Sequence, residues 1–111
     1  MASIYSSLLW QIHAVPSDST VFIDLDPVQT TIVRDMDVFL AGVGGGGFSV
    51  WDEASCTFWS VESPTGGSGT WEMWRGRQVF PPGGQLYFKP SLIDAFGTAD
   101  LRISGYRLTP P

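Results

Sequence analysis

Turn-forming residues interrupt this chain at short intervals, and their spacing restricts its possible folds more than any other feature. Thirteen glycines and eight prolines are spread over 111 residues, which leaves little room for helices of ordinary length. The segments between them are rich in Val, Ile, Thr, Phe, Tyr and Trp, the residue types that favour strands. The chain is therefore predicted to consist of short strands joined by turns.

Apolar and polar residues alternate within these segments, as they do in strands that bury one face. Val21, Ile23 and Leu25 share one face of such a segment, and Leu86 and Phe88 share one face of another. The predicted strands lie in residues 20–25, 31–40, 47–51, 56–61, 70–75, 85–89 and 99–104, and the segment 4–12 fits either a strand or a short helix.

About eight short strands at this spacing are typical of an all-β sandwich or barrel. A chain of 111 residues also has the size of one domain. We therefore predict a single antiparallel β-sandwich, jelly-roll-like, over residues 1–111. The run from Pro81 to Gly84 is expected to form a turn, and the segment 91–96 is expected to form one helical turn.

Composition and charge exclude several classes of protein. Charged residues make up 15% of the chain, against about 25% in an average soluble domain, which argues against disorder and against a coiled coil. A net charge of −5 with only six basic residues argues against nucleic acid as a partner. No apolar run is long enough to cross a membrane, and the first residues lack the pattern of a secretory signal. We expect a protein that is soluble in the cytoplasm where it is made.

The sequence offers little for catalysis or for metal binding. Cys56 is the single cysteine and His13 the single histidine, so neither an intramolecular disulfide nor a multi-Cys zinc site can form. The glycine-rich run 42–47 lacks the Lys-Ser/Thr pair and the helix of a phosphate-binding loop, and a strand resumes after it. We therefore predict no catalytic, cofactor-binding or metal-binding residue. The run 42–47 is expected to be a loop that a neighbouring subunit orders.

Carboxylates occur in three close pairs: Asp24 with Asp26, Asp35 with Asp37, and Asp52 with Glu53. Alternate residues of a strand point the same way, about 7 Å apart, which suits a metal site or paired catalytic carboxylates. The other interpretation, a solvated strand face, is favoured because charges there protect sheet edges. Asp35 and Asp100, which stand near Arg34 and Arg102, are predicted to form cross-strand ion pairs. The opposite face of the segment 31–40 carries Ile32, Met36, Val38 and Leu40.

Tryptophan is unusually frequent, with five residues in this small chain. One interpretation places them in the core, and the other places one or two at an interface with a protein subunit or a sugar. Trp71 and Trp74 are three residues apart and therefore lie on opposite faces of their predicted strand. The predicted interface residues are Trp51, Trp59, Trp71 and Trp74, with Arg75 and Arg77 at its polar rim.

Two regions of the chain resemble small all-β minor structural proteins of long-tailed bacteriophages. In the first, a proline-containing turn at residues 15–24 leads to a strand, and an Arg-Asp strand follows at residues 30–38. In the second, residues 76–88 match a Pro-Gly turn and strand, and residues 104–108 match a Ser-Gly-Tyr ending. The segment 26–29 departs from this pattern, since the related proteins carry Pro-Ala-Gly before the Arg-Asp strand.

The resemblance implies a non-enzymatic structural protein of a phage virion, most simply a minor tail protein. Such a protein would form homo-oligomers or pack against other virion proteins, with no cofactor, nucleic acid or membrane as partner. The alternatives are a head decoration or accessory protein, and a carbohydrate-binding β-sandwich module that contacts host-surface carbohydrate. A small metal-dependent enzyme such as a cupin is disfavoured, because one histidine cannot build its usual multi-histidine site.

Overall fold

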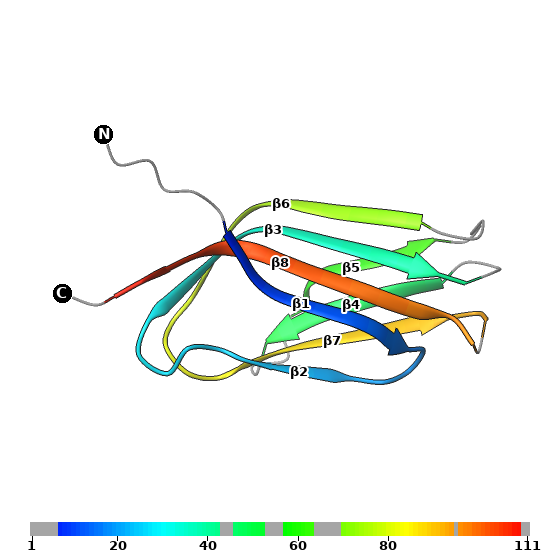
Figure 1. Ribbon diagram of the computed structural model, residues 1–111, viewed down its shortest axis with the longest axis horizontal. Helices are drawn as coiled ribbons and strands as arrows, with labels where there is room; N and C mark the ends of the chain where they lie inside the picture. Colours follow the sequence, from blue (N-terminus) through cyan, green and yellow to red (C-terminus); the bar gives the residue numbers. More distant parts are fainter. Residues whose placement is uncertain (1–6, 43–45, 53–56, 64–69, 95, 110–111) are drawn as a thin grey trace.

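Two antiparallel sheets of four strands each form the protein, and the predicted β-sandwich is confirmed (Figure 1). The computed structural model describes residues 7–42, 46–52, 57–63, 70–94 and 96–109, and these contain no helix. The strands are β1 (Ser7–Pro16), β2 (Val21–Asp24), β3 (Thr30–Ala41), β4 (Gly46–Asp52), β5 (Thr57–Ser63), β6 (Thr70–Phe80), β7 (Gln85–Leu92) and β8 (Thr98–Leu108).

The strand order is that of a jelly roll. The first sheet, sheet A, has the order β1-β8-β3-β6, and the second, sheet B, has the order β2-β7-β4-β5. The chain crosses repeatedly from one sheet to the other, so that only β4 and β5 are neighbours both in sequence and in a sheet. Double-sheet jelly rolls of eight strands have this architecture. Strands β1 and β6 are the edges of sheet A, and β2 and β5 are the edges of sheet B.

The core lies between the sheets and is built from the alternating residues that the sequence indicates. Leu86 and Phe88 of β7 are fully buried, as are Leu101 and Ile103 of β8. Met36, Val38 and Leu40 of β3 also belong to this buried cluster. These buried residues confirm the predicted inward faces of β3, β7 and β8.

A β-bulge corrects the predicted face of one residue in β3. Ile32 was expected to share a side with Met36, but Val33 occupies the core cluster instead, and Ile32 is buried outside it. The register of β3 shifts between Val33 and Asp35 against both of its neighbours, because Arg34 is an extra residue in the ladder with β8. Because of this extra residue, the side chains that precede the bulge point to the opposite face of the sheet from the one that simple alternation predicts. The side chain of Arg34 donates a hydrogen bond to the carbonyl oxygen of Gly76, at 2.9 Å.

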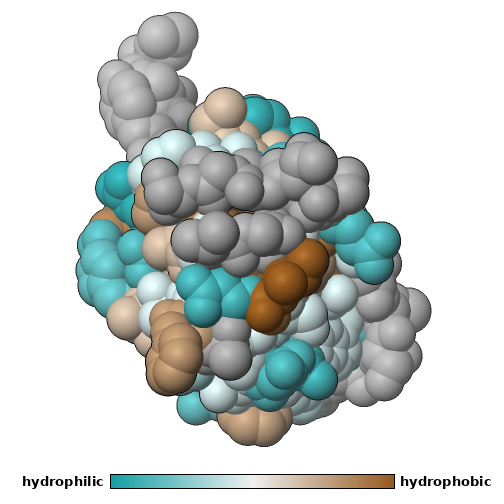
Figure 2. Space-filling model, turned by 90° about the vertical axis from the view of Figure 1, so that its right-hand side faces the viewer, coloured by the Kyte–Doolittle hydropathy of each residue, from teal (hydrophilic) through white to brown (hydrophobic). Residues whose placement is uncertain are grey.

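The predicted helical turn at residues 91–96 is wrong, because β7 continues through Leu92. Backbone pairing with β4 and a 2.8 Å hydrogen bond from Leu92 N to Ser17 Oγ hold this extension in the sheet. The chain then turns at Asp94, whose carbonyl oxygen accepts a hydrogen bond from Gly97 N at 2.9 Å. Ile93 and Phe96, in the turn between β7 and β8, are left exposed. Figure 2 faces the end of the sandwich that carries this turn.

Other predicted segments fall partly outside the described residues. Residues 7–12 belong to β1, which selects the strand interpretation for this part of the segment 4–12. Gly46 and Gly47 begin β4, whereas residues 43–45 of the predicted glycine-rich loop, and Cys56, lie outside the described residues.

The predicted turn at residues 81–84 is present, and it is hydrogen-bonded to the backbone of Asp26. Gly83 and Gly84 have φ values of 82° and 83°, a region that glycine occupies without strain. Gly83 N donates to the carbonyl oxygen of Asp26 at 2.8 Å. The Asp26 carboxylate accepts hydrogen bonds from Gln29 N and Val28 N, both at 2.8 Å. These two backbone donors, Gln29 first, lower the pKa of Asp26 from its ordinary value of 3.8.

We expect Asp26→Asn to reduce the pH dependence of stability in the acid range. Because the pKa of Asp26 is lower in the folded chain, its ionised form adds stability above the ordinary pKa, and this contribution is lost as the pH falls through the folded value. Melting temperatures of the wild type and the variant, measured between about pH 2 and about pH 6, should therefore converge towards low pH. A difference that stays constant across this range would contradict this role of Asp26.

Candidate interaction surfaces

The structure divides the predicted interface residues among three places. Trp59 and Trp74 pack against the core, and the Trp59 ring meets the Phe48 ring edge-on with centroids 4.6 Å apart. Trp71 is 59% exposed, so the predicted placement of Trp71 and Trp74 on opposite faces of β6 is confirmed. Trp51 belongs to β4 and lies on the outer face of sheet B, away from Trp71.

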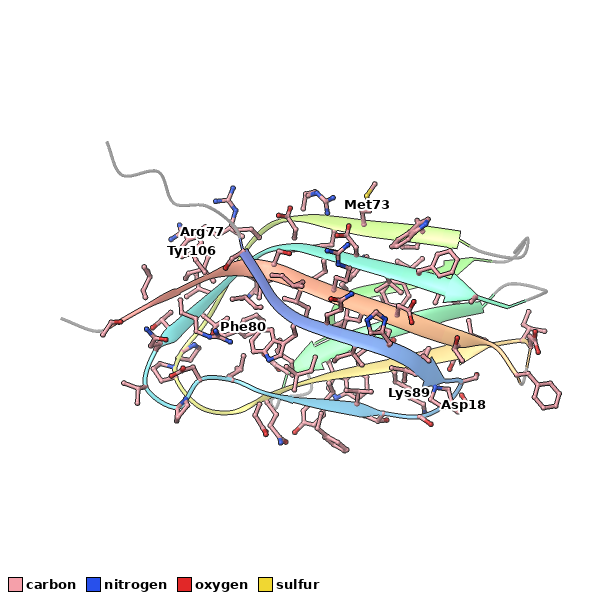
Figure 3. The ribbon with its side chains drawn as sticks, in the orientation of Figure 1. Asp18, Met73, Arg77, Phe80, Lys89 and Tyr106 are labelled. Carbon is pink, nitrogen blue, oxygen red and sulfur yellow. The ribbon has the colours of Figure 1, made fainter. Side chains whose placement is uncertain are left out.

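The first candidate surface is an apolar cluster on the outer face of sheet A, which we call the β6 patch and define as Phe39, Trp71 and Met73. The rings of Phe39 and Trp71 pack with centroids 4.8 Å apart, across the pairing of β3 with β6. Met73 is 64% exposed on the same face (Figure 3). The patch thus combines an aromatic pair with a flexible thioether on an edge strand.

A charged network borders the β6 patch. The Arg75 guanidinium contacts Asp35 at 3.1 Å and Asp37 at 3.2 Å, both on the neighbouring strand β3. Asp35 therefore forms a cross-strand ion pair as predicted, with Arg75 as its partner. Exposed ion pairs add little stability, but two carboxylates hold this guanidinium beside the Met73 sulfur, at 3.4 Å. Arg77 is exposed farther along β6 (Figure 3).

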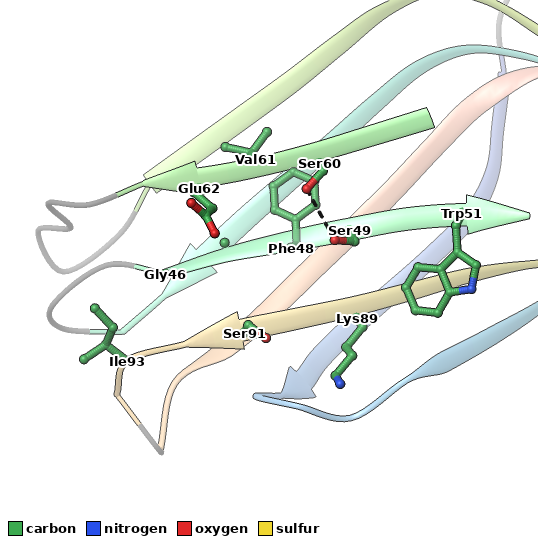
Figure 4. A pocket seen from close by; sticks show the side chains of 11 residues that line it. Gly46, Phe48, Ser49, Trp51, Ser60, Val61, Glu62, Lys89, Ser91 and Ile93 are labelled. Atoms are coloured by element: carbon green, nitrogen blue, oxygen red, sulfur yellow. Dashed lines mark hydrogen bonds between the residues drawn. The ribbon is translucent and has the colours of Figure 1, made fainter. Parts of the chain in front are cut away.

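The second candidate surface is an open groove of about 770 Å³ on the outer face of sheet B (Figure 4). Small residues form its floor: Gly47 and Ser49 of β4, Ser60 of β5 and Ser91 of β7. The register places Ser49 opposite Ser60, and Gly47 opposite Ser91. Because these neighbouring side chains are all short, the sheet surface is hollow here. We call this feature the sheet B groove.

An aromatic row crosses sheet B at one end of the groove. Trp51 stacks on Tyr87 with centroids 5.5 Å apart and an interplanar angle of 20°. Phe22 then meets Tyr87 edge-on, at 5.4 Å and 84°. Sequence reasoning selected Trp51 but missed Tyr87 and Phe22. The signal was present, because Tyr87 alternates with the inward residues Leu86 and Phe88.

The described residues contain no group of three or more His, Cys, Asp or Glu side chains placed to hold a metal ion. Asp100 lies 4.0 Å from the His13 imidazole and accepts a hydrogen bond from Ala14 N at 2.7 Å. In this part of the chain there is also no helix of the length and apolarity that a membrane span requires.

Comparison with known proteins does not place the chain in a family. No protein-family model matches it, and no curated protein matches it significantly.

Proposed function

We propose that this chain is a non-enzymatic structural protein of a tailed-bacteriophage virion, most simply a minor tail protein, which assembles through its β6 patch. Two features support the proposal: the sequence resemblance in residues 15–24, 30–38, 76–88 and 104–108, and the jelly-roll fold. Jelly rolls serve in viral capsid proteins among other classes, and fold alone does not define function. The surface through which this chain contacts a partner must therefore be inferred from its side chains.

The exposure of the β6 patch is the observation that carries this proposal. Trp71 and Met73 are both more than half exposed, although each would gain from burial. Tryptophan, methionine and arginine are enriched in protein interfaces relative to the rest of the surface, and the Arg75 guanidinium lies beside the Met73 sulfur. The patch thus has the composition of an interface anchor.

The position of the patch on an edge strand supports the same conclusion. β6 spans 11 residues and pairs within its sheet with β3 alone. Natural edge strands are usually short or carry Lys or Pro, which block pairing with another chain. β6 has neither Lys nor Pro within its bounds, and its charged residues are Glu72, Arg75 and Arg77, of which Arg75 is held by Asp35 and Asp37. A neighbouring subunit, either a second copy or another virion protein, can therefore cover the patch and approach the strand edge.

We expect Trp71→Ala to weaken self-association by about 2 kcal/mol, or about 30-fold in Kd, because the indole is the largest group in the patch. Sedimentation equilibrium of the purified chain measures this constant directly. Phe22→Ala is the matched control, since Phe22 is exposed to a similar degree on the other sheet. A wild type that stays monomeric at high concentration, or equal Kd values for Trp71→Ala and the wild type, would contradict assembly of copies through this patch.

The virion assignment has a separate test. Mass spectrometry of purified particles of the phage that encodes the chain should detect it at a stoichiometry of several copies per particle. Its absence from intact particles would refute a structural role in the virion, whatever its behaviour in solution.

A further inference from the structure

We propose that the sheet B groove is a saccharide-binding site. This function is separate from assembly, because the groove lies on the outer face of sheet B, whereas the β6 patch lies on the outer face of sheet A. The ligand of the sheet B groove must be recognised by side chains, because β4 and β7 are central strands whose backbone groups pair within the sheet. A peptide added as an extra strand cannot be held on this face.

The polar groups of the groove suit a ligand that carries many hydroxyl groups. The hydroxyls of Ser49 and Ser60 lie 3.4 Å apart across the floor. The Ser91 hydroxyl donates to Asp18 Oδ1 at 3.1 Å and can still accept a hydrogen bond from a ligand. Each hydroxyl can donate one hydrogen bond and accept two. Lys89 and Glu62 also line the groove, and neither has an ion-pair or hydrogen-bond partner among the described residues. A donor, an acceptor and several groups that do both therefore face the same space (Figure 4).

Trp51 supplies the apolar element that a sugar ring requires. Its indole borders the groove at the end where Lys89 lies (Figure 4). Stacking on Tyr87 fixes the indole, and the Tyr87 hydroxyl in turn donates to Gln85 Oε1 at 3.3 Å. A wall that is rigid before binding costs little entropy when the ligand arrives. One face of a sugar ring presents C–H groups to an aromatic surface, while its hydroxyls remain available at the rim.

Other classes of ligand fit this groove less well. Nucleic acid is opposed by the net charge of −5 and by the Glu62 carboxylate in the lining. An apolar ligand would cover the Lys89 ammonium and the Glu62 carboxylate without offering either a partner, at a cost for each group. A saccharide alone matches both the hydroxyl floor and the aromatic wall.

A printed array of bacterial cell-wall, capsular and plant oligosaccharides tests the proposal, followed by calorimetric titration of the strongest hit. We expect the wild type to bind at least one glycan, and Trp51→Ala to weaken that binding at least tenfold. Trp51→Ala also removes the contact with Tyr87, so a second variant is needed. Ser60→Leu fills the groove from an exposed position and should abolish binding while the melting temperature stays close to that of the wild type.

Val28→Ala is the control, because it removes an exposed apolar side chain outside both candidate surfaces and should leave the glycan affinity unchanged. Binding that survives both Trp51→Ala and Ser60→Leu would place the ligand elsewhere and overturn the proposal. The absence of any array signal above background for the folded wild type would overturn it as well.

Discussion

Replacing Phe88 by alanine is expected to lower the free energy of unfolding by about 3–5 kcal/mol. Phe88 is 0% exposed, belongs to the central strand β7, and packs against the Phe48 ring with centroids 5.9 Å apart. Removing its ring loses buried apolar area and leaves a cavity that the surrounding strands cannot close fully. Because a domain of this size is typically stable by about 5–15 kcal/mol, the loss would be a large share of the total.

Urea denaturation followed by circular dichroism measures this effect as a lower midpoint with an unchanged slope. Phe22→Ala is the control: it makes the same chemical change on β2, but Phe22 is 63% exposed and its aromatic partner is Tyr87. We expect this control to lose no more than about 1 kcal/mol. Equal losses in the two variants would show that the core does not lie between the sheets.

The second large effect is expected for Gly105→Ala, with a loss of about 3 kcal/mol or more. Gly105 is buried in β8, directly opposite Val33 of β3. A Cβ at this position would strike the carbonyl oxygen of Ile32 and come within 3.1 Å of the Val33 Cα. These are backbone atoms, so β3 and β8 would have to separate at the bulge.

Ser104→Ala is the matched control for Gly105→Ala, because Ser104 precedes it on the same strand and the change adds no atoms. The control is expected to melt within a few degrees of the wild type. Full stability of Gly105→Ala would mean that β3 and β8 are farther apart than the structure places them.

Much of the fold could be predicted because local alternation and burial agree. Leu86 and Phe88, like Leu101 and Ile103, alternate with polar residues and face the core. The face of Ile32 could not be predicted in this way, because the bulge at Arg34 arises only when β3 pairs with two neighbours at once. The sequence pattern wrongly predicts a helical turn at the end of β7 for a similar reason. Its extended form depends on β4 and on Ser17, which are distant in the sequence.

The two candidate surfaces also differ in how far the sequence alone predicts them. Counting residues along one strand predicts that Trp71 and Trp74 lie on opposite faces, but it does not tell which of the two is exposed. The packing of Trp74 against the core decides this. Trp59 could not be assigned to the core without knowing that Phe48 lies beside it. The sheet B groove was not predictable, because Gly47, Ser60 and Ser91 come from three strands, and their shortness matters only when the strands lie side by side.

The strand order also constrains how the chain reaches its native state during synthesis. β8 is the last of the eight strands to be made, yet it lies between β1 and β3 in sheet A. Sheet A therefore cannot form before residues 98–108 have left the ribosome, and β1 must wait for a partner that is translated almost a full chain length later. Chains that depend on such distant pairings fold slowly, on a scale of about milliseconds to seconds. Throughout that interval β1 and β3 lack the strand that lies between them in the native sheet, and apolar surface that is buried in the native chain is open to aggregation.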